Sequence, residues 1–295
     1  MTERRIKSRL LHSYLNDPSA IAGSLILLVF LAAAVLAPWI TPQNPYDLEK
    51  VSLEHFLTPP LWMEGGQKPF VLGTDDQGRG IFSTIVYGCR TSLIVGFGVV
   101  LIAGSFGVVI GLLAGYYGGW LDTVTMRLAD TFFSFSTTLL AILFLGVFGR
   151  SSIFIVIIAI CIADWVRYAR TMRGSVLQVK EEAYILAAKA SGAGDFRLLA
   201  KHILPNAIAP IFVVVAVDLA VVIMLEATLS FLGVGVPVTE PSLGMMISIG
   251  KNYIYAGMWW MIVFPGAALI LLVVGINLFA DWLREELNPK IQRKA

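Results

Sequence analysis

Long apolar stretches separated by polar segments dominate this chain. A helix that crosses a bilayer needs about 20 mostly apolar residues. Six stretches satisfy or approach this length, and the pattern predicts spans at 21–40, 91–116, 131–148, 153–166, 207–231 and 258–282. The sequence therefore predicts an all-α integral membrane protein with six transmembrane helices.

Two of these spans allow a second interpretation. The first follows four basic residues, as a signal peptide does, but its apolar run is too long for a typical signal sequence, so we interpret it as a retained span. Spans three and four are separated only by residues 149–152, and span four is short. One long helix in their place is the alternative, and it would reverse the orientation of everything that follows.

The distribution of basic residues predicts the orientation. With the N-terminus in the cytoplasm, 16 of the 22 lysines and arginines fall in cytoplasmic segments, as the positive-inside rule requires. Both termini are therefore predicted inside. The predicted organisation is a cytoplasmic N-terminal segment (1–20), a first span (21–40), an external segment (41–90), a five-helix core (91–282) with a cytoplasmic loop (167–205), and a cytoplasmic tail (283–295).

Composition excludes several function classes. The chain is 57% hydrophobic and 14% charged, whereas soluble proteins carry about 25% charged residues. A net charge of +2 without basic–aromatic clusters gives no support for nucleic-acid binding. Cys89 and Cys161 form no C-x-x-C pair, and His12, His55 and His202 lie far apart. We therefore predict no metal site, no catalytic constellation and no enzyme activity.

The internal segment 171–205 is predicted to form two amphipathic helices joined by a turn. Ser191-Gly192 would end the first helix, because glycine accepts the left-handed conformation common just past a helix end. Asp195 is a good N-cap for the second helix, and Pro205 discourages its continuation. Two interpretations of this helical pair are equally open: it lies as a hairpin on lipid headgroups, or it is a docking element for a soluble partner.

Two further patterns lie inside the spans. Ala103, Gly107, Gly111 and Gly115 recur every fourth residue, which lets another helix approach closely, either within the chain or from another subunit. Asp218 lies about 18 Å into span five, at 1.5 Å per residue, and Glu226 lies near the external surface. We assign both to a translocation path. The alternative for Asp218 is a satisfied contact with a neighbouring helix.

A resemblance to a known family emerges from several motifs. Leu186-Ala187-Ala188-Lys189-Ala190-Ser191-Gly192, followed by His202-Ile203-Leu204-Pro205, resembles the EAA loop of ABC-importer permeases. Leu186 stands where the motif has an acid, so the contact of that acid is not carried over. Segments 72–83, 114–122, 226–233, 264–266 and 281–284 resemble the dipeptide/oligopeptide/nickel permeases, so the resemblance covers essentially the whole chain. The external signature contains Gly73, Thr74, Asp75, Asp76, Gly78 and Arg79.

The resemblance implies a type I ABC importer permease fold in the bacterial inner membrane, with a coupling helix between helices four and five. The implied ATPase-coupling residues are Leu186, Ala187, Ala188, Lys189, Ala190, Ser191, Gly192, Ala193, Asp195 and Phe196. Implied partners are a second homologous permease in a heterodimer, two ATP-binding subunits, an external substrate-binding protein and the lipid membrane. The chain has no P-loop, so ATP and Mg²⁺ are expected on the partners and no cofactor on this chain.

The expected function is to form half of a path for peptides, by alternating access. Nickel or another small solute is the alternative within the family. An ion-coupled secondary transporter is the alternative outside it, although no internal repeat is visible. The external segment 41–90 is interpreted either as a contact for the binding protein or as a cap over the outer pore.

Overall fold

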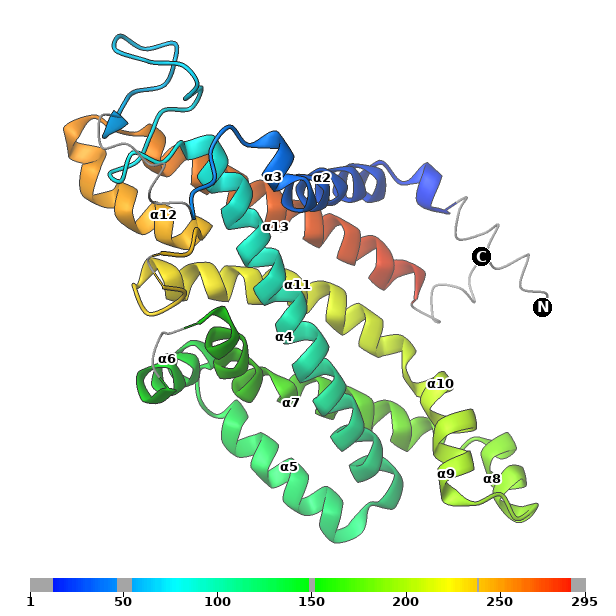
Figure 1. The fold of residues 1–295 in the computed structure, drawn as a ribbon. Coiled ribbons are helices and arrows are strands. Elements are labelled where there is room, and N and C mark those ends of the chain that lie inside the picture. The colour runs from blue at the N-terminus through cyan, green and yellow to red at the C-terminus, as the bar shows by residue number, and fades with distance from the viewer. Residues whose placement is uncertain (1–12, 47–54, 149–151, 238, 288–295) are drawn as a thin grey trace.

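The chain folds as a bundle of helices, several of them long (Figure 1). The computed structural model describes residues 13–46, 55–148, 152–237 and 239–287. Within these ranges it has no strand, and β-pairing is limited to one bridge between Thr74 and Gly80. The predicted cytoplasmic ends 1–12 and 288–295, and most of the connection between spans three and four, lie outside the described residues.

The helices follow one another along the chain with short connections, apart from the external segment. In chain order they are α2 (Pro18–Val35), α3 (Ala37–Ile40), α4 (Ile81–Tyr117), α5 (Gly119–Phe133), α6 (Thr137–Phe148), α7 (Ile153–Val179), α8 (Ala183–Ala190), α9 (Asp195–Arg197), the π-helical η2 (Leu198–Ile203), α10 (Leu204–Ala207), α11 (Ala209–Phe231), α12 (Leu243–Gly250), the 3₁₀-helical η3 (Lys251–Ala256) and α13 (Trp260–Glu286).

The first two spans differ from their predicted limits. The helix of the first span ends at Val35, and residues 37–40 form the separate α3, which has Pro38 in its first turn. α4 begins at Ile81, ten residues before the predicted start, and includes the end of the predicted external segment. Its 37 residues measure about 55 Å at 1.5 Å per residue, longer than the ~30 Å bilayer core.

The third predicted span, 131–148, is wrong as a single helix. The chain breaks after Phe133, and α5 and α6 meet at an angle of 91°. The Ser134 hydroxyl donates to the carbonyl of Thr131 at 2.7 Å. Serine side chains compete in this way with the backbone hydrogen bonds that would continue a helix. The 12 residues of α6 are too few to cross a bilayer alone.

Among the residues that the structure describes, four helices are long and apolar enough to cross a membrane: α2, α4, α11 and α13. The bent pair α5–α6 gives a fifth if it is one broken span. α7 has 27 residues but carries Asp164, Arg167 and Arg170. Large apolar side chains such as Leu28 (63% exposed) and Leu101 (65% exposed) lie on the outside, where lipid accommodates them. The count of six spans stays a prediction.

Close packing of α4 against α7 forms the largest part of the core. A Cβ on Gly107 would lie 2.5 Å from the carbonyl oxygen of Trp165, and one on Gly115 would lie 2.9 Å from the side chain of Val176. The stripe of small residues thus serves packing within the chain. At the two ends of the described chain, Ser13 Oγ donates to Glu286 at 2.9 Å, so both ends lie on the same side of the bundle.

Candidate functional site

The helix α7, which precedes the predicted coupling region, is longer than its apolar stretch. The apolar stretch was predicted to end at Val166, but the helix continues without a break to Val179. These 13 residues extend about 20 Å at 1.5 Å per residue. The first predicted internal helix is therefore two helices, because α7 ends at Val179 and α8 begins at Ala183. We call residues 167–179 the stem and residues 183–207 the coupling segment.

The turn inside the coupling segment agrees with the sequence prediction. α8 ends at Ala190, and Gly192 follows with φ +82°, the left-handed conformation that glycine adopts without strain. Asp195 is not the predicted N-cap. Gly194 holds that position, and Asp195 is the first residue of α9. Its carboxylate instead accepts a hydrogen bond of 2.6 Å from the hydroxyl of Tyr116, at the end of α4.

The second internal helix passes Pro205 without stopping. Residues 198–203 form a π-helical turn in which Leu204 N–H donates to Leu199 O, five residues back. This wider turn lets the chain continue into α10, where Pro205 lies in the first turn and needs no N–H donor. Asn206 does not cap the next span, because its side-chain amide donates to the carbonyl of His202 at 2.6 Å.

The coupling segment has a buried face and an exposed face. Ile185, Leu198 and Ile203 are at most 3% exposed, and two of them pack into the core with Val176 of the stem. The apolar sides of the two predicted amphipathic helices therefore face the protein itself. Leu186 is 55% exposed and Phe196 is 85% exposed. The other predicted coupling residues are exposed or half-buried: Ala187, Ala188, Lys189, Ala190, Ser191, Gly192, Ala193 and Asp195.

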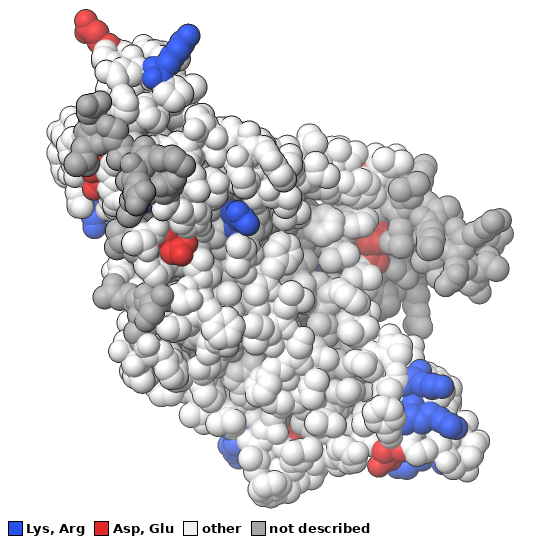
Figure 2. All heavy atoms as spheres, in the orientation of Figure 1, with Lys and Arg blue, Asp and Glu red and all other residues white. Residues whose placement is uncertain are grey.

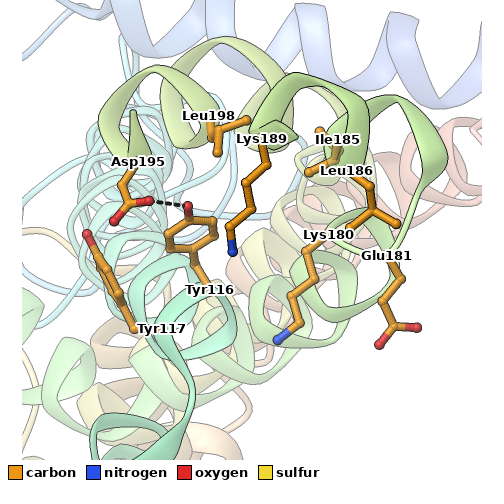
Figure 3. Close-up of a pocket in the computed structure, with 9 residues that line it drawn as sticks. All are labelled: Tyr116, Tyr117, Lys180, Glu181, Ile185, Leu186, Lys189, Asp195 and Leu198. Atoms are coloured by element: carbon orange, nitrogen blue, oxygen red, sulfur yellow. Dashed lines mark hydrogen bonds between the residues drawn. The ribbon is translucent and has the colours of Figure 1, made fainter. Parts of the chain in front are cut away.

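A hollow of about 460 Å³ lies between the coupling segment and the inner end of α4 (Figure 3). Tyr116 and Tyr117 border it from α4, and Lys189 of α8 extends toward Tyr116. Lys180, at the end of the stem, donates to the carbonyl of Gly115 at 3.0 Å. The coupling segment is thus bonded to α4 through Asp195 and packed on α7 through Ile185 and Ile203, and Lys180 joins the end of α7 to α4. A displacement of the segment would therefore act on both helices.

Asp218 is buried in α11, at 2% exposed, and both of its oxygens are engaged. Arg167 of α7 donates to one oxygen at 2.6 Å, and the Tyr168 hydroxyl donates to the other at 2.7 Å. Arg167 also lies 3.5 Å from Asp164. In this structure Asp218 therefore makes a satisfied contact with a neighbouring helix, which is the second of the two interpretations given for it. Its part in a translocation path stays a prediction.

Glu226 is fully buried and is held by three serine hydroxyls. Ser92 of α4 donates to one carboxylate oxygen, and Ser230 of α11 and Ser242 before α12 donate to the other, all at 2.8 Å. These distances are typical of well-formed O–H···O hydrogen bonds, and the three bonds join α4, α11 and the start of α12 at this point. We call Glu226 and these serines the serine cage. The assignment of Glu226 to a path stays a prediction, and the cage gives it a structural role.

The external signature forms a tight turn in front of α4. The Asp75 carboxylate accepts from the Arg79 backbone N–H at 2.8 Å and from Arg79 Nε at 2.7 Å, with both side chains buried. Thr74, which is also buried, bonds to residues 55 and 58, and Gly73 (φ +84°) and Gly78 (φ +76°) supply the left-handed positions. Burial raises the pKa of the Asp76 carboxyl, and the neighbouring Asp75 adds to the shift. These residues therefore fix the entry of the chain into α4.

Sequence reasoning missed the series of ion pairs along the stem side of α7. Arg170 pairs with Asp130 at 2.6 Å and stacks on the Phe133 ring at 4.4 Å, and Arg173 pairs with Asp122. Arginines three residues apart lie on one side of a helix, so the spacing of Arg167, Arg170 and Arg173 was a usable signal. The acids on α5 could not be matched to them without the fold.

Comparison with known proteins agrees with this geometry. Residues 107–293 match the family described as "Binding-protein-dependent transport system inner membrane component", and residues 9–60 match the "N-terminal TM domain of oligopeptide transport permease C". The dipeptide transport system permease protein DppC of Haemophilus influenzae is 37% identical over 278 residues, which cover 94% of this chain and 92% of that protein. The di/tripeptide transport system permease protein DppC of Pseudomonas aeruginosa is 36% identical over 283 residues, covering 96% and 92%.

A solved structure supports the fold alone. The inward-facing MetNI methionine ABC transporter has a chain with a TM-score of 0.56 and 18% identity, and the alignment covers 70% of this chain and 98% of that one. The four long apolar helices and this fold agree with the family match to inner-membrane components. This chain belongs to the family of binding-protein-dependent transport system inner membrane components and is a permease subunit of an ABC importer.

Proposed function

We propose that this chain forms half of the translocation path of an importer for short peptides, and that separate ATP-binding subunits drive it through the coupling segment. The observation that carries the proposal is the exposed face of the coupling segment, with Leu186 and Phe196 on the outside. The segment follows a helix, α7, that runs without a break about 20 Å past the predicted end of its apolar stretch. A soluble partner can reach the segment there.

The proposed assembly has four further components: a second, homologous permease, two ATP-binding subunits and an external substrate-binding protein. ATP and Mg²⁺ would bind to the ATP-binding subunits, since this chain has no phosphate-binding loop in its sequence. Closure of those subunits would displace the coupling segment. Because the segment is bonded to α4 through Tyr116 and leads directly into α11, the displacement would tilt the spans and open the path alternately to each side.

The peptide substrate is inferred from the relatives, whose names specify dipeptides and tripeptides. Identity above 35% over more than 90% of both chains supports a common substrate class. The external binding protein would deliver the peptide, and the permease would supply the path.

Purification and reconstitution test the proposal. The tagged chain, isolated from its own cells in mild detergent, is expected to bring a second permease and ATP-binding subunits with it. After reconstitution with the binding protein, vesicles should accumulate radiolabelled dialanine only with hydrolysable ATP. Uptake that a protonophore abolishes and a non-hydrolysable ATP analogue leaves intact would indicate ion coupling instead. Uptake of Ni²⁺ without dialanine would refute the peptide assignment.

A further inference from the structure

A cavity of about 510 Å³ between α7, α11 and the end of α13 is bordered by charges of both signs. Arg167 and Arg170 border it from α7, Asp218 from α11, and Arg284 from the last turn of α13. The rest of its wall is mainly apolar, with Phe133, Val213, Val214 and Val217. We call it the inner cavity. Its volume lies within the range of about 300–1,000 Å³ that is usual for small-molecule sites.

Charged side chains are sparse along the middle of the bundle. On the face drawn in Figure 2, most of the described Lys, Arg, Asp and Glu side chains lie toward the ends of the molecule, and the middle is almost uncharged. A charge inside a membrane is costly, so it normally faces protein or a water-filled passage, and it often marks the route of a substrate. Arg167 and Arg284 lie within two residues of the predicted inner ends of spans four and six. We therefore expect the inner cavity at the cytoplasmic end of a passage.

The negative end of the cavity has two carboxylates for one arginine. Arg167 bonds to Asp218 at 2.6 Å and lies 3.5 Å from Asp164. Asp164 is 3% exposed, and its Oδ2 has no hydrogen-bond partner among the described residues. Asp218 accepts two hydrogen bonds, whereas a carboxylate offers about four acceptor positions. The two acids therefore keep a surplus negative charge and can accept further hydrogen bonds from a cationic group.

The positive end of the cavity is formed by two arginines. Arg170 donates to Asp130 through one nitrogen and lies over the Phe133 ring at 4.4 Å. Its guanidinium group has five N–H donors, so others are left for a ligand. Arg284 is exposed, and within the described part of the chain no acid pairs with it. Guanidinium groups bind carboxylates well, because their planar donors match the two carboxylate oxygens.

We propose that the inner cavity binds a short peptide by its two charged ends. Asp218, supported by the charge of Asp164, would take the α-ammonium group. Arg170 and Arg284 would take the terminal carboxylate. This inference rests on the proposed function and names the part of the substrate that this chain recognises. The charged ends are common to all unmodified peptides, and the apolar wall would accept side chains of different shapes.

Photolabelling of the purified wild-type complex tests the site. The complex is used without its binding protein, whose own selection of peptides would mask that of the permease. The probe is the dipeptide alanyl-benzoylphenylalanine, which should label this chain at Phe133 or within residues 213–217. Dialanine should prevent the labelling. N-acetyldialanine and dialanine amide, which each lack one charged end, should need roughly ten-fold higher concentrations, as expected for the loss of a hydrogen bond between charged groups.

Two outcomes of the labelling would overturn the inference. One is labelling outside the inner cavity, or equal competition by a peptide that is blocked at both ends. The other is protection by short-chain phosphatidylglycerol but not by dialanine, which would show that the arginines hold a lipid phosphate.

Two substitutions of similar shape separate the two ends of the peptide. Asp164→Asn should remove the preference for a free ammonium group and keep the preference for a free carboxylate. Arg284→Gln should do the reverse, whereas a general structural defect would weaken all three competitors equally. Arg127→Gln is the matched control, since Arg127 is exposed on α5 and does not border the cavity, and it should keep both preferences. Unchanged maleimide reactivity of the two buried cysteines would show that each variant is folded.

The variants also separate this inference from the proposed function. If the reconstituted wild-type complex accumulates no dialanine with ATP, the proposed function fails. If it accumulates dialanine and both cavity variants keep the wild-type preferences, the inner cavity is not the peptide site and the proposed function stands. If Asp164→Asn alone keeps them, a proton rather than the peptide's ammonium group balances the two acids, and the assignment of the negative end is wrong.

Discussion

Replacement of Glu226 by alanine tests the serine cage. Glu226 is 0% exposed, and alanine would leave the hydroxyls of Ser92, Ser230 and Ser242 without their acceptor. A buried polar group that loses its partner costs about 1–3 kcal/mol. Serines in helices can turn to a backbone carbonyl, which lowers the cost for Ser92 and Ser230. Burying the carboxyl group of Glu226 itself costs free energy, and the alanine variant avoids this cost, which offsets part of the remaining destabilisation.

The net effect of Glu226→Ala is therefore a destabilisation of about 3 kcal/mol. This corresponds to a fall of roughly 6–12 °C in Tm at about 2–4 °C per kcal/mol. Glu226→Gln keeps the shape and one acceptor oxygen, and its amide can donate to a serine that turns round. Its cost should be about 1 kcal/mol. Thr228→Ala is the matched control, because Thr228 is exposed on the same helix and its hydroxyl bonds only to its own helix.

The protein contains its own reporter for this experiment. Cys89 and Cys161 are free thiols at 1% and 7% exposure, and Cys89 lies three residues before Ser92 on α4. Heating the purified protein with a fluorogenic maleimide reports unfolding as the thiols become accessible. The reasoning is refuted if the alanine variant reacts at the same temperature as wild type, or if the alanine and glutamine variants lose equal stability.

Three further changes test the helix contacts. Asp218→Asn should lower peptide uptake several-fold and leave assembly intact, because Asn cannot hold Arg167 as a charge pair; normal uptake would contradict this. Gly107→Ala should destabilise by roughly 2 kcal/mol, since its Cβ would meet the backbone of α7 at 2.5 Å, whereas Gly104→Ala, with 3.5 Å to its nearest neighbour, should melt like wild type. Tyr116→Phe removes the bond to Asp195, so ATP hydrolysis should continue while uptake per ATP falls; an unchanged ratio would show that the bond transmits nothing.

Continuous apolar runs explain what the sequence could predict. The limits of α11 and α13 agree with the predicted spans within a few residues, because the lipid-facing pattern is uninterrupted there. The stop at Gly192 followed from the conformational freedom of one residue. The break after Phe133 was missed because Ser-Phe-Ser is only weakly polar, and its effect depends on a local hydrogen bond rather than on hydropathy.

Polar contacts between distant helices could not be predicted in the same way. Arg167 and Asp218 are 51 residues apart, and Ser92 and Glu226 are 134 apart. Hydropathy places each residue at a depth in the membrane but not at a rotation about its helix. The sequence could therefore place Asp218 within span five without showing that two side chains of α7 already satisfy it.

α7 joins the two halves of the proposed mechanism within one rigid element. Arg167 and Tyr168, at the start of the stem, hold Asp218 of α11, and the other end of the stem leads to the coupling segment. The glycine contacts with α4 leave no space for α7 to slide on its own, so a force on the coupling segment should turn α4 and α7 together. The contact between Arg167 and Asp218 then lies at the boundary between the moving pair and α11. An Arg167→Lys variant, which keeps the charge but loses the fork of donors, should therefore alter uptake more than it alters binding of the ATP-binding subunit.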